Sequence, residues 1–440
     1  MKQNIPQIAV QIPDTLIPQP GIDLQKWAVI ACDQFTSEPE YWHAVESLVG
    51  ASPSTLHITL PEVYLGQAQE QSRQNQVVAN MRQYLAEDIF MHIEDFILVE
   101  RTVGHKTRHG LILALDLEQY DFKPGSTSLI RASEGTIIDR LPPRIIIRQQ
   151  ALIETPHILV LIDDPHKTVI EPLVSLKNQL SRLYDFELMQ GSGHLRGYRV
   201  SQPSVESQII QAFENLSDPQ GFTRKYDLKS GTPVLLFAVG DGNHSLATAK
   251  SVWEKLKPTV GLDHPARYAL VEIENIHDQG LEFEPIHRVL FGVHQEIKPA
   301  LTAFYPGQVT FESCPDQNEL LRKIATSSSA CHTMGLVTPS GLELVQINRP
   351  RANLAVGSLQ SFLDDWLKSG GADKIDYIHG ADVVFKLGNQ PGQLGFILPA
   401  MAKQDLFKTV ILDGVLPRKA FSMGEAHEKR FYLECRKIVS

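Results

Sequence analysis

Short apolar runs alternate with polar loops and amphipathic stretches along most of the 440-residue chain. The clearest example is residues 234–250. Six apolar residues there predict a buried strand, glycines at 240 and 242 break it, and apolar residues then return at helical spacing. The same order of strand, polar loop and helix is predicted for residues 27–48. Repetition of this unit predicts a mixed α/β fold of the α+β type.

The same pattern divides the chain into three consecutive regions, which agrees with the two to three domains expected for this length. We expect an N-terminal α/β region at residues 1–125, a central core at residues 126–295, and a C-terminal α/β region with a basic tail loop at residues 296–440. Two further helices are predicted from spacing. One follows Asp163-Asp164 and extends to Leu183, and the other begins near Ser422.

Composition narrows the class of protein. Apolar residues make up 42% of the chain and charged residues 21%, as in soluble globular proteins. The net charge of −10 argues against a general nucleic-acid binder or a membrane-surface binder. The chain has no apolar run long enough to span a bilayer, and its first residues lack a signal-peptide pattern, so we expect a cytoplasmic protein. The four cysteines are widely separated and predict neither a disulfide framework nor a structural zinc site.

The loop between the strand and the helix at residues 240–245 is a candidate anion site. The first turn of a helix presents free N–H groups, and Gly242 allows a ligand to approach the backbone closely. Asn243 or Ser245 could cap this turn, while Asp241 and His244 bring acid, base or metal-binding capacity to the same point. The alternative is an ordinary strand-to-helix turn in which the side chain of Asp241 hydrogen-bonds to the nearby backbone.

A second candidate segment, residues 131–148, concentrates basic residues in an acidic protein. Its arginines could recognise phosphate or carboxylate groups, and they are Arg131, Arg140, Arg144 and Arg148. Glu134 lies among them, with Thr136 close behind, and is a candidate general base for a hydroxyl group. The alternative is a solvated basic face whose carboxylates form surface ion pairs.

Two more basic pairs follow strand-like or loop segments. His287 and Arg288 could hold a phosphate or carboxylate, although a core-edge histidine beside a surface arginine explains the pair equally well. Arg418 and Lys419 precede the helix predicted near Ser422 and form a second basic loop at a helix entrance.

The run Asp241-Gly242-Asn243-His244-Ser245 resembles the Asp-Gly-His-His-Arg motif of the domain of unknown function 1015 family, and the resemblance extends over nearly the whole chain. The order of features is also similar to that of the ParB-like superfamily, which includes an ADP-dependent free-serine kinase. This resemblance implies a ParB-like, serine-kinase-like core. It maps the catalytic glutamate of the kinase onto Glu134 and its C-terminal loop onto Pro417, Arg418 and Lys419.

Two positions depart from the family motif. Asn243 occupies the position of the first histidine of the motif, and Ser245 occupies the position of its arginine. The second replacement removes a positive charge suited to phosphate. Arg131, Arg140 or Arg288 would then have to supply that charge.

Together these features predict a phosphoryl-transfer enzyme, a kinase or a phosphatase, acting on a small hydroxy or amino acid, with serine or phosphoserine favoured. ADP or ATP would be the nucleotide, and Asp241 would bind Mg²⁺ through water. The alternative function is a non-catalytic nucleotide-binding regulatory or switch protein of the ParB-like class. The expected partners are a small-molecule substrate and a nucleotide, without nucleic acid or membrane, and homo-oligomer formation is left open.

Overall fold

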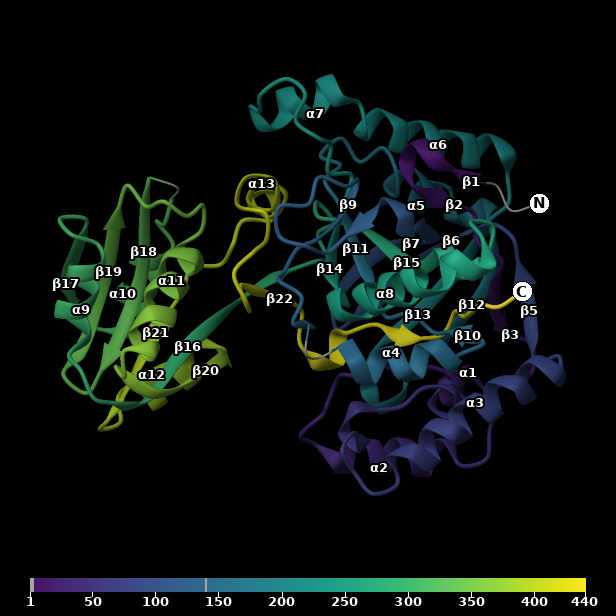
Figure 1. The fold of residues 1–440 in the computed structure, drawn as a ribbon, viewed down its shortest axis with the longest axis horizontal. Helices are drawn as coiled ribbons and strands as arrows, with labels where there is room; N and C mark the ends of the chain where they lie inside the picture. Colours follow the sequence, from purple (N-terminus) through teal and green to yellow (C-terminus); the bar gives the residue numbers. More distant parts are fainter. Residues whose placement is uncertain (1–3, 139–140, 329) are drawn as a thin grey trace. The chain divides into compact units, whose positions relative to one another are not determined.

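The computed structural model describes residues 4–138, 141–328 and 330–440 (Figure 1). The chain divides into two compact units. Unit 1 contains the described residues up to Leu281 together with Gly424–Ser440, and unit 2 is Glu282–Met423. Both units contain strands and helices, which confirms the mixed α/β class. The division into three consecutive sequence regions stays a prediction.

Unit 1 is built on a mixed sheet. Its main path follows β12 (Ser181–Glu187), β13 (His194–Val200), β6 (Phe96–Val103), β7 (Lys106–Asp116), β15 (Tyr268–Asn275), β11 (Leu159–Ile162), β14 (Phe237–Asp241), β9 (Ile130–Ala132) and β8 (Tyr120–Asp121). The short strand β2 (Val10–Gln11) pairs with β7, and β1 (Asn4–Ile5) pairs with β2. Strand β14 lies between β11, its antiparallel neighbour, and β9, its parallel neighbour. The end of β14 therefore lies within the sheet and not at its edge.

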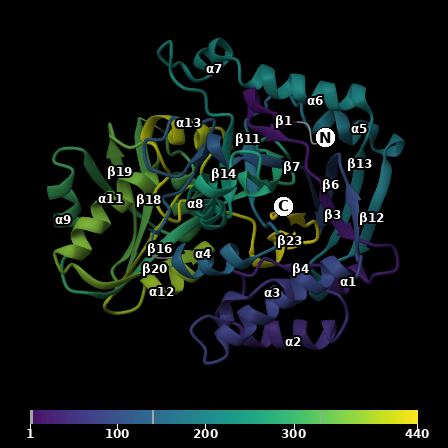
Figure 2. The same ribbon diagram turned by 45° about the vertical axis from the view of Figure 1, so that its right-hand side comes forward.

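Both faces of this sheet are buried. Successive residues of a strand point to opposite faces, so Leu98 enters one hydrophobic cluster while Ile97 and Val99 enter another. Helices α6 (Pro203–Leu216) and α8 (Asn243–Val260) contribute to the first cluster, and α2 (Pro39–Val49) and α3 (Glu70–Ala86) to the second. Figures 1 and 2 show α6 on the opposite side of unit 1 from α2 and α3. The result is a three-layer unit whose sheet is held between two cores.

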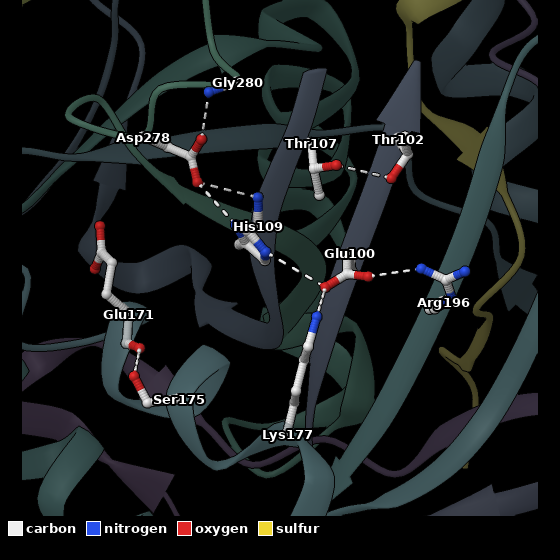
Figure 3. A network of polar contacts seen from close by, with 10 residues as sticks. All are labelled: Glu100, Thr102, Thr107, His109, Glu171, Ser175, Lys177, Arg196, Asp278 and Gly280. Carbon is white, nitrogen blue, oxygen red and sulfur yellow. Dashed lines mark hydrogen bonds and ion pairs between the residues drawn. The ribbon is translucent and has the colours of Figure 1, made fainter. Parts of the chain in front are cut away.

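A polar network connects the segment that follows β15 to the central strands of unit 1 (Figure 3). Asp278 accepts hydrogen bonds from the backbone N–H groups of His109 and Gly280, at 3.2 and 2.6 Å. The ring of His109 lies between two carboxylates, with Nδ1 3.2 Å from Asp278 and Nε2 3.5 Å from Glu100. Glu100 also pairs with Lys177 at 2.6 Å, so the network joins β6 and β7 to the loop that leads into unit 2.

The C-terminal segment returns to unit 1 and pairs with its early strands. Strand β23 (Phe431–Tyr432) lies against β4 (Val29–Ile30), and β24 (Arg436–Lys437) lies against β10 (Ile153–Glu154). A similar small sheet joins β3 (Thr15–Pro18) to β5 (Phe90–Ile93). Arg430 is buried in this segment and forms ion pairs at 2.6 Å with Glu272 of β15 and with Glu434.

One predicted helix is shorter than expected, and another is wrong. The helix predicted as far as Leu183 ends at Leu176 as α5 (Glu171–Leu176), and β12 begins at Ser181, because its residues pair with β13. No helix longer than one turn is found among the described residues after Ser422. The segment Phe421–Met423 is strand β22, and Glu425 and Glu428 close a single turn at Ala426–Glu428 through a capping box.

Unit 2 contains an antiparallel sheet. Its order is β17 (Val309–Cys314), β19 (Gly341–Asn348), β18 (Cys331–Thr338), β21 (Gln393–Ile397), β16 (Phe283–Val293) and β20 (Ala372–His379), and β22 adds to β16. Helices α10 (Gln317–Ile324) and α12 (Ala381–Gly388) cover one face, where a side chain at Gly335 would collide with Leu320 and Ile324. On the other face, His332 contacts Ser358 of α11 (Ala355–Lys368). Helices α9 (Ile297–Phe304) and α13 (Lys403–Asp413) complete the unit.

Candidate active site

The candidate site lies where β14 ends and α8 begins. Gly242 joins the two elements with a φ of 78°, in the left-handed region that glycine adopts readily. A Cβ at this position would lie 3.0 Å from the Cα of Ile158, so the backbone also approaches its neighbour too closely for a side chain. No side chain of the described residues caps the first turn of this 18-residue helix. The N–H groups of an uncapped first turn can bind an anion.

Asp241 ends β14 and is paired with Lys429 of the C-terminal segment. The Nζ of Lys429 lies 3.1 Å from Oδ2, and the N–H of Gly242 donates to Oδ1 at 2.9 Å. Burial alone would raise the pKa of Asp241, but Lys429 and the nearby His157 hold that pKa below its ordinary value. The aspartate is therefore ionised at neutral pH and orients a lysine beside the start of α8.

His157 lies just before β11 and connects three segments. Its Nε2 is 3.2 Å from the hydroxyl of Ser245 in the first turn of α8, and its Nδ1 is 2.9 Å from the hydroxyl of Tyr432. A carboxylate oxygen of Asp33 lies 3.7 Å from the same Nε2. This imidazole can exchange a proton with the Ser245 hydroxyl or orient it toward a ligand.

The segment that contains Glu134 reaches the same end of the sheet. In the parallel pairing of β9 with β14, Ala132 lies opposite Val239, and Glu134 follows two residues later. Asp241 is the last residue of β14, so both carboxylate-bearing residues lie at or just beyond the carboxyl ends of two neighbouring parallel strands. Glu134 is half-buried there. In open α/β sheets this is the place where ligands bind.

Residues 136–137 also approach the start of α8. The backbone N–H of Ile137 donates to Nε2 of His244 at 3.3 Å, which favours the neutral tautomer with its hydrogen on Nδ1. The hydroxyl of Thr136 and Oδ1 of Asn243 are both buried, and neither has a hydrogen-bond partner among the described residues. Buried polar atoms of this kind are usually satisfied by a ligand or by water.

The arginines of the basic segment have other partners. Arg131 is buried, and its guanidinium donates to the carbonyls of Ser128 and Pro233 at 2.8 and 2.9 Å. It therefore connects the segments that precede β9 and β14. Burial lowers its pKa to about 10. Arg144 lies on α4 (Leu141–Gln150), a helix that the sequence interpretation missed, and pairs with Glu62. The predicted phosphate-binding residue at position 140 lies outside the described residues.

Four of the predicted residues belong to unit 2. Nδ1 of His287 accepts a hydrogen bond from the backbone N–H of Leu398 at 3.1 Å, and burial beside Arg288 lowers the pKa of His287 to about 4. Arg288 is fully buried and donates to the carbonyls of Arg418 and Lys419, both at 3.0 Å. His287 and Arg288 therefore support the fold of unit 2, and Arg288 fixes the loop that carries the two exposed basic side chains.

The structure also adds residues that sequence interpretation missed. His157, Lys429 and Tyr432 meet Asp241 and Ser245 although they come from distant segments. None of the three stands in a motif, and the sequence pattern places Lys429 on a helix surface. Only the return of the C-terminal strand β23 to β4 brings Lys429 and Tyr432 to this place.

Among the described residues, no group of three or more histidine, cysteine, aspartate or glutamate side chains is placed to hold a metal ion. Asp241, the expected Mg²⁺ ligand, is instead paired with Lys429.

The chain belongs to the family described as protein of unknown function (DUF1015), which matches residues 16–366. The family identified from the sequence is thus confirmed. No curated protein matches the chain. In the part of the chain that the structure describes, no helix has both the length and the apolar character required to cross a bilayer.

Three solved structures illustrate the similarity. A free serine kinase variant in complex with AMP covers 74% of this chain and 91% of its own, with 12% identity and a TM-score of 0.38. A conserved hypothetical protein from Pyrococcus furiosus covers 74% and 95%, with 12% identity and a TM-score of 0.35. SbnI from Staphylococcus aureus, truncated at its C-terminus, covers 74% and 87%, with 10% identity and a TM-score of 0.37.

Proposed function

We propose that unit 1 is a phosphoryl-transfer enzyme acting on a small hydroxy or amino acid, with serine or phosphoserine favoured and ADP or ATP as the nucleotide. The observation that carries this proposal is the first turn of α8, which no described side chain caps and which lies next to Lys429. Two buried oxygens close to it, on Thr136 and Asn243, have no hydrogen-bond partner in the part of the chain that the structure describes. Helix N–H groups and a lysine together suit a phosphate group.

In this proposal the phosphate lies at the first turn of α8, within reach of Lys429. Glu134 acts as general base and takes the proton of the acceptor hydroxyl. The acceptor oxygen forms a bond to phosphorus while the bond from phosphorus to the leaving phosphate oxygen breaks. Phosphoryl transfer depends mainly on positioning and on electrostatic stabilisation, which fixed N–H groups and a paired lysine provide. No step is assigned to Mg²⁺.

His244 and Ser245 act beside this reaction centre. His244 holds the segment after Glu134 against α8 through the N–H of Ile137, so it positions the base. Ser245 stands where the family motif has an arginine, and its hydroxyl is oriented by His157. A hydroxyl and an imidazole offer hydrogen bonds but less fixed charge than a guanidinium, which makes Lys429 the main cation of the proposed site.

The test is turnover of serine and phosphoserine with ADP and ATP, followed by ³¹P NMR, in the intact chain and in a Glu134→Gln variant. Loss of a general base should lower turnover by about 10²- to 10⁴-fold while leaving ligand-induced thermal stabilisation in place. A Glu94→Gln variant is the matched control, because that side chain is exposed and lies in the turn between β5 and β6. Unchanged turnover in Glu134→Gln would remove the glutamate from the mechanism.

A second function is favoured by one observation, the absence of the motif arginine at Ser245. A nucleotide-binding regulatory protein needs the anion site but no acceptor site. It would show stabilisation by ADP or ATP that Lys429→Ala abolishes, without turnover of any small acceptor.

A further inference from the structure

Unit 2 contains a cavity of about 700 Å³ that the proposed function does not use. It lies between the end of α9, the first half of α11 and the loop that follows α13. Its polar lining includes Tyr305, Arg351, Gln360, Asp364, Asp413 and Arg418, all within unit 2. A volume of this size is typical of small-molecule binding sites.

Two cations line this cavity, and neither has a counter-ion among the residues that the structure describes. Arg351 is exposed and forms no hydrogen bond or ion pair with any described residue. Arg418 donates Nε and Nη2 to the hydroxyl of Tyr377, at 3.0 and 2.6 Å, and this neutral partner leaves its charge uncompensated. Two guanidinium groups suit a doubly charged phosphate monoester better than a single carboxylate, because each can form paired charge-assisted hydrogen bonds.

Arg288 and Tyr377 hold the loop that carries Arg418 in place. Arg288 donates to the backbone carbonyl of Arg418 at 3.0 Å and to the side chain of Gln360 at 3.0 Å. The guanidinium groups of Arg288 and Arg418 lie 4.6 and 5.3 Å from the centre of the Tyr377 ring. A buried arginine and an aromatic ring thus orient the exposed arginine before any ligand arrives, which lowers the entropy lost on binding.

The remaining wall offers acceptors and apolar surface. Asp364 and Asp413 each accept one hydrogen bond, from Gln360 and from the backbone of Asn353, and form no ion pair with the described lysines, arginines or histidines that line the cavity. Their free oxygens can accept hydrogen bonds from hydroxyl or amino groups. Phe304 adds an exposed ring to the same cavity.

Thr409 also lines the cavity, and its buried hydroxyl has no hydrogen-bond partner among the described residues. We propose that this cavity is a second ligand site, which binds a small phosphorylated metabolite carrying hydroxyl or amino groups. Arg351 and Arg418 hold the phosphate, and Asp364 and Asp413 receive the donors.

The test is isothermal titration of the full chain with two matched pairs of probes: AMP against adenosine, and O-phosphoserine against serine. At least one phosphate monoester should bind ten times more tightly than its unphosphorylated partner. Arg351→Gln and Arg418→Gln should each weaken that binding at least tenfold. Lys368→Gln is the control, because this exposed lysine of α11 does not line the cavity.

Two further variants distinguish binding in this cavity from binding in unit 1 and from a role of the Tyr377 hydroxyl. Lys429→Ala alters the proposed site of unit 1 and should leave the cavity binding unchanged. Tyr377→Phe removes the hydroxyl that Arg418 contacts while keeping the ring, and binding should stay within about threefold. The proposal is overturned if no phosphate monoester binds more tightly than its partner, or if the two arginine variants retain full affinity.

Discussion

Single residues decide whether the candidate active site can form at all. Gly242 combines a positive φ with a close approach to Ile158, so its replacement is penalised twice. Gly261 ends the same helix with the same φ of 78°, but a side chain there would meet nothing within 4 Å. The two glycines also differ in ψ, which is 24° at Gly242 and 175° at Gly261, where the backbone lies in a region almost restricted to glycine.

We expect Gly242→Ala to lower the free energy of unfolding by about 2–4 kcal/mol, because backbone strain adds to a collision with Ile158. Gly261→Ala should cost about 1–3 kcal/mol from backbone strain alone, because a side chain there meets no neighbour. Denaturant unfolding of both variants measures the two values. A loss of only about 1 kcal/mol in Gly242→Ala, the cost of the left-handed backbone alone, would show that the contact with Ile158 is relieved at no cost.

At this scale the sequence predicted only what is local. Asp241 and Gly242 stand out because a strand, two glycines and a helix follow each other directly. Arg131 looked equally suited to phosphate, yet the fold buries it against main-chain carbonyls. Local sequence does not reveal which charged side chain a sheet will cover.

Elements from opposite ends of the chain complete unit 1. Arg430, just before β23, bridges two buried glutamates, Glu272 and Glu434, at 2.6 Å each, and donates to the carbonyl of Pro156 at 2.8 Å. The same segment carries Lys429 to Asp241. Stability of the C-terminal strands and geometry of the candidate site are therefore coupled.

Arg430→Leu should lower the free energy of unfolding of unit 1 by about 3–5 kcal/mol, because two buried carboxylates lose their shared cation. Lys437→Ala is the control in the same segment, since this side chain is exposed, and it should change stability by less than about 0.5 kcal/mol. Chemical denaturation followed by tryptophan fluorescence compares the two. A loss below about 1 kcal/mol in Arg430→Leu would contradict the bridging role.

Elements with strong periodicity were predicted correctly, as α8 shows. Elements that depend on pairing were not. The segment after Leu176 has helical spacing, but β12 forms there because β13 offers a ladder of backbone partners. Helix α4 was missed because Pro142 and Pro143 look like helix breakers, although proline is tolerated in a first turn.

Each of the two units that make up the whole molecule contains a buried group with a shifted pKa, and the two shifts have opposite directions. Burial raises the pKa of Glu274 in unit 1 to about 7, despite the neighbouring Arg108. Its stabilising contribution is present below about pH 4.5 and is lost as the pH rises through 7. In unit 2, burial lowers the pKa of His332 to about 4, so its contribution is present above pH 6.5 and is lost as the pH falls toward 4.

Thermal unfolding should accordingly show two transitions, one for each unit, with opposite contributions from these two groups between pH 4.5 and 7. Each contribution reaches about 3 kcal/mol over its full range. Glu274→Gln should change the pH dependence of the unfolding temperature of unit 1 alone. His332→Asn should change the pH dependence of the unfolding temperature of unit 2 alone. Calorimetry at several pH values measures this. A single transition whose slope responds to both variants would show that the units unfold together.

Sequence alone was enough to establish the mixed α/β class, the family, and the strand–glycine–helix unit at Asp241 and Gly242, because these depend on local periodicity and on contiguous motifs. The remaining features depend on tertiary structure. Tertiary structure placed His157, Lys429 and Tyr432 beside Asp241 and Gly242, because strand pairing joins residues regardless of their separation along the chain. It likewise divided the predicted basic residues between two units and gave most of them structural partners, since a buried charge must be paired wherever the fold places it.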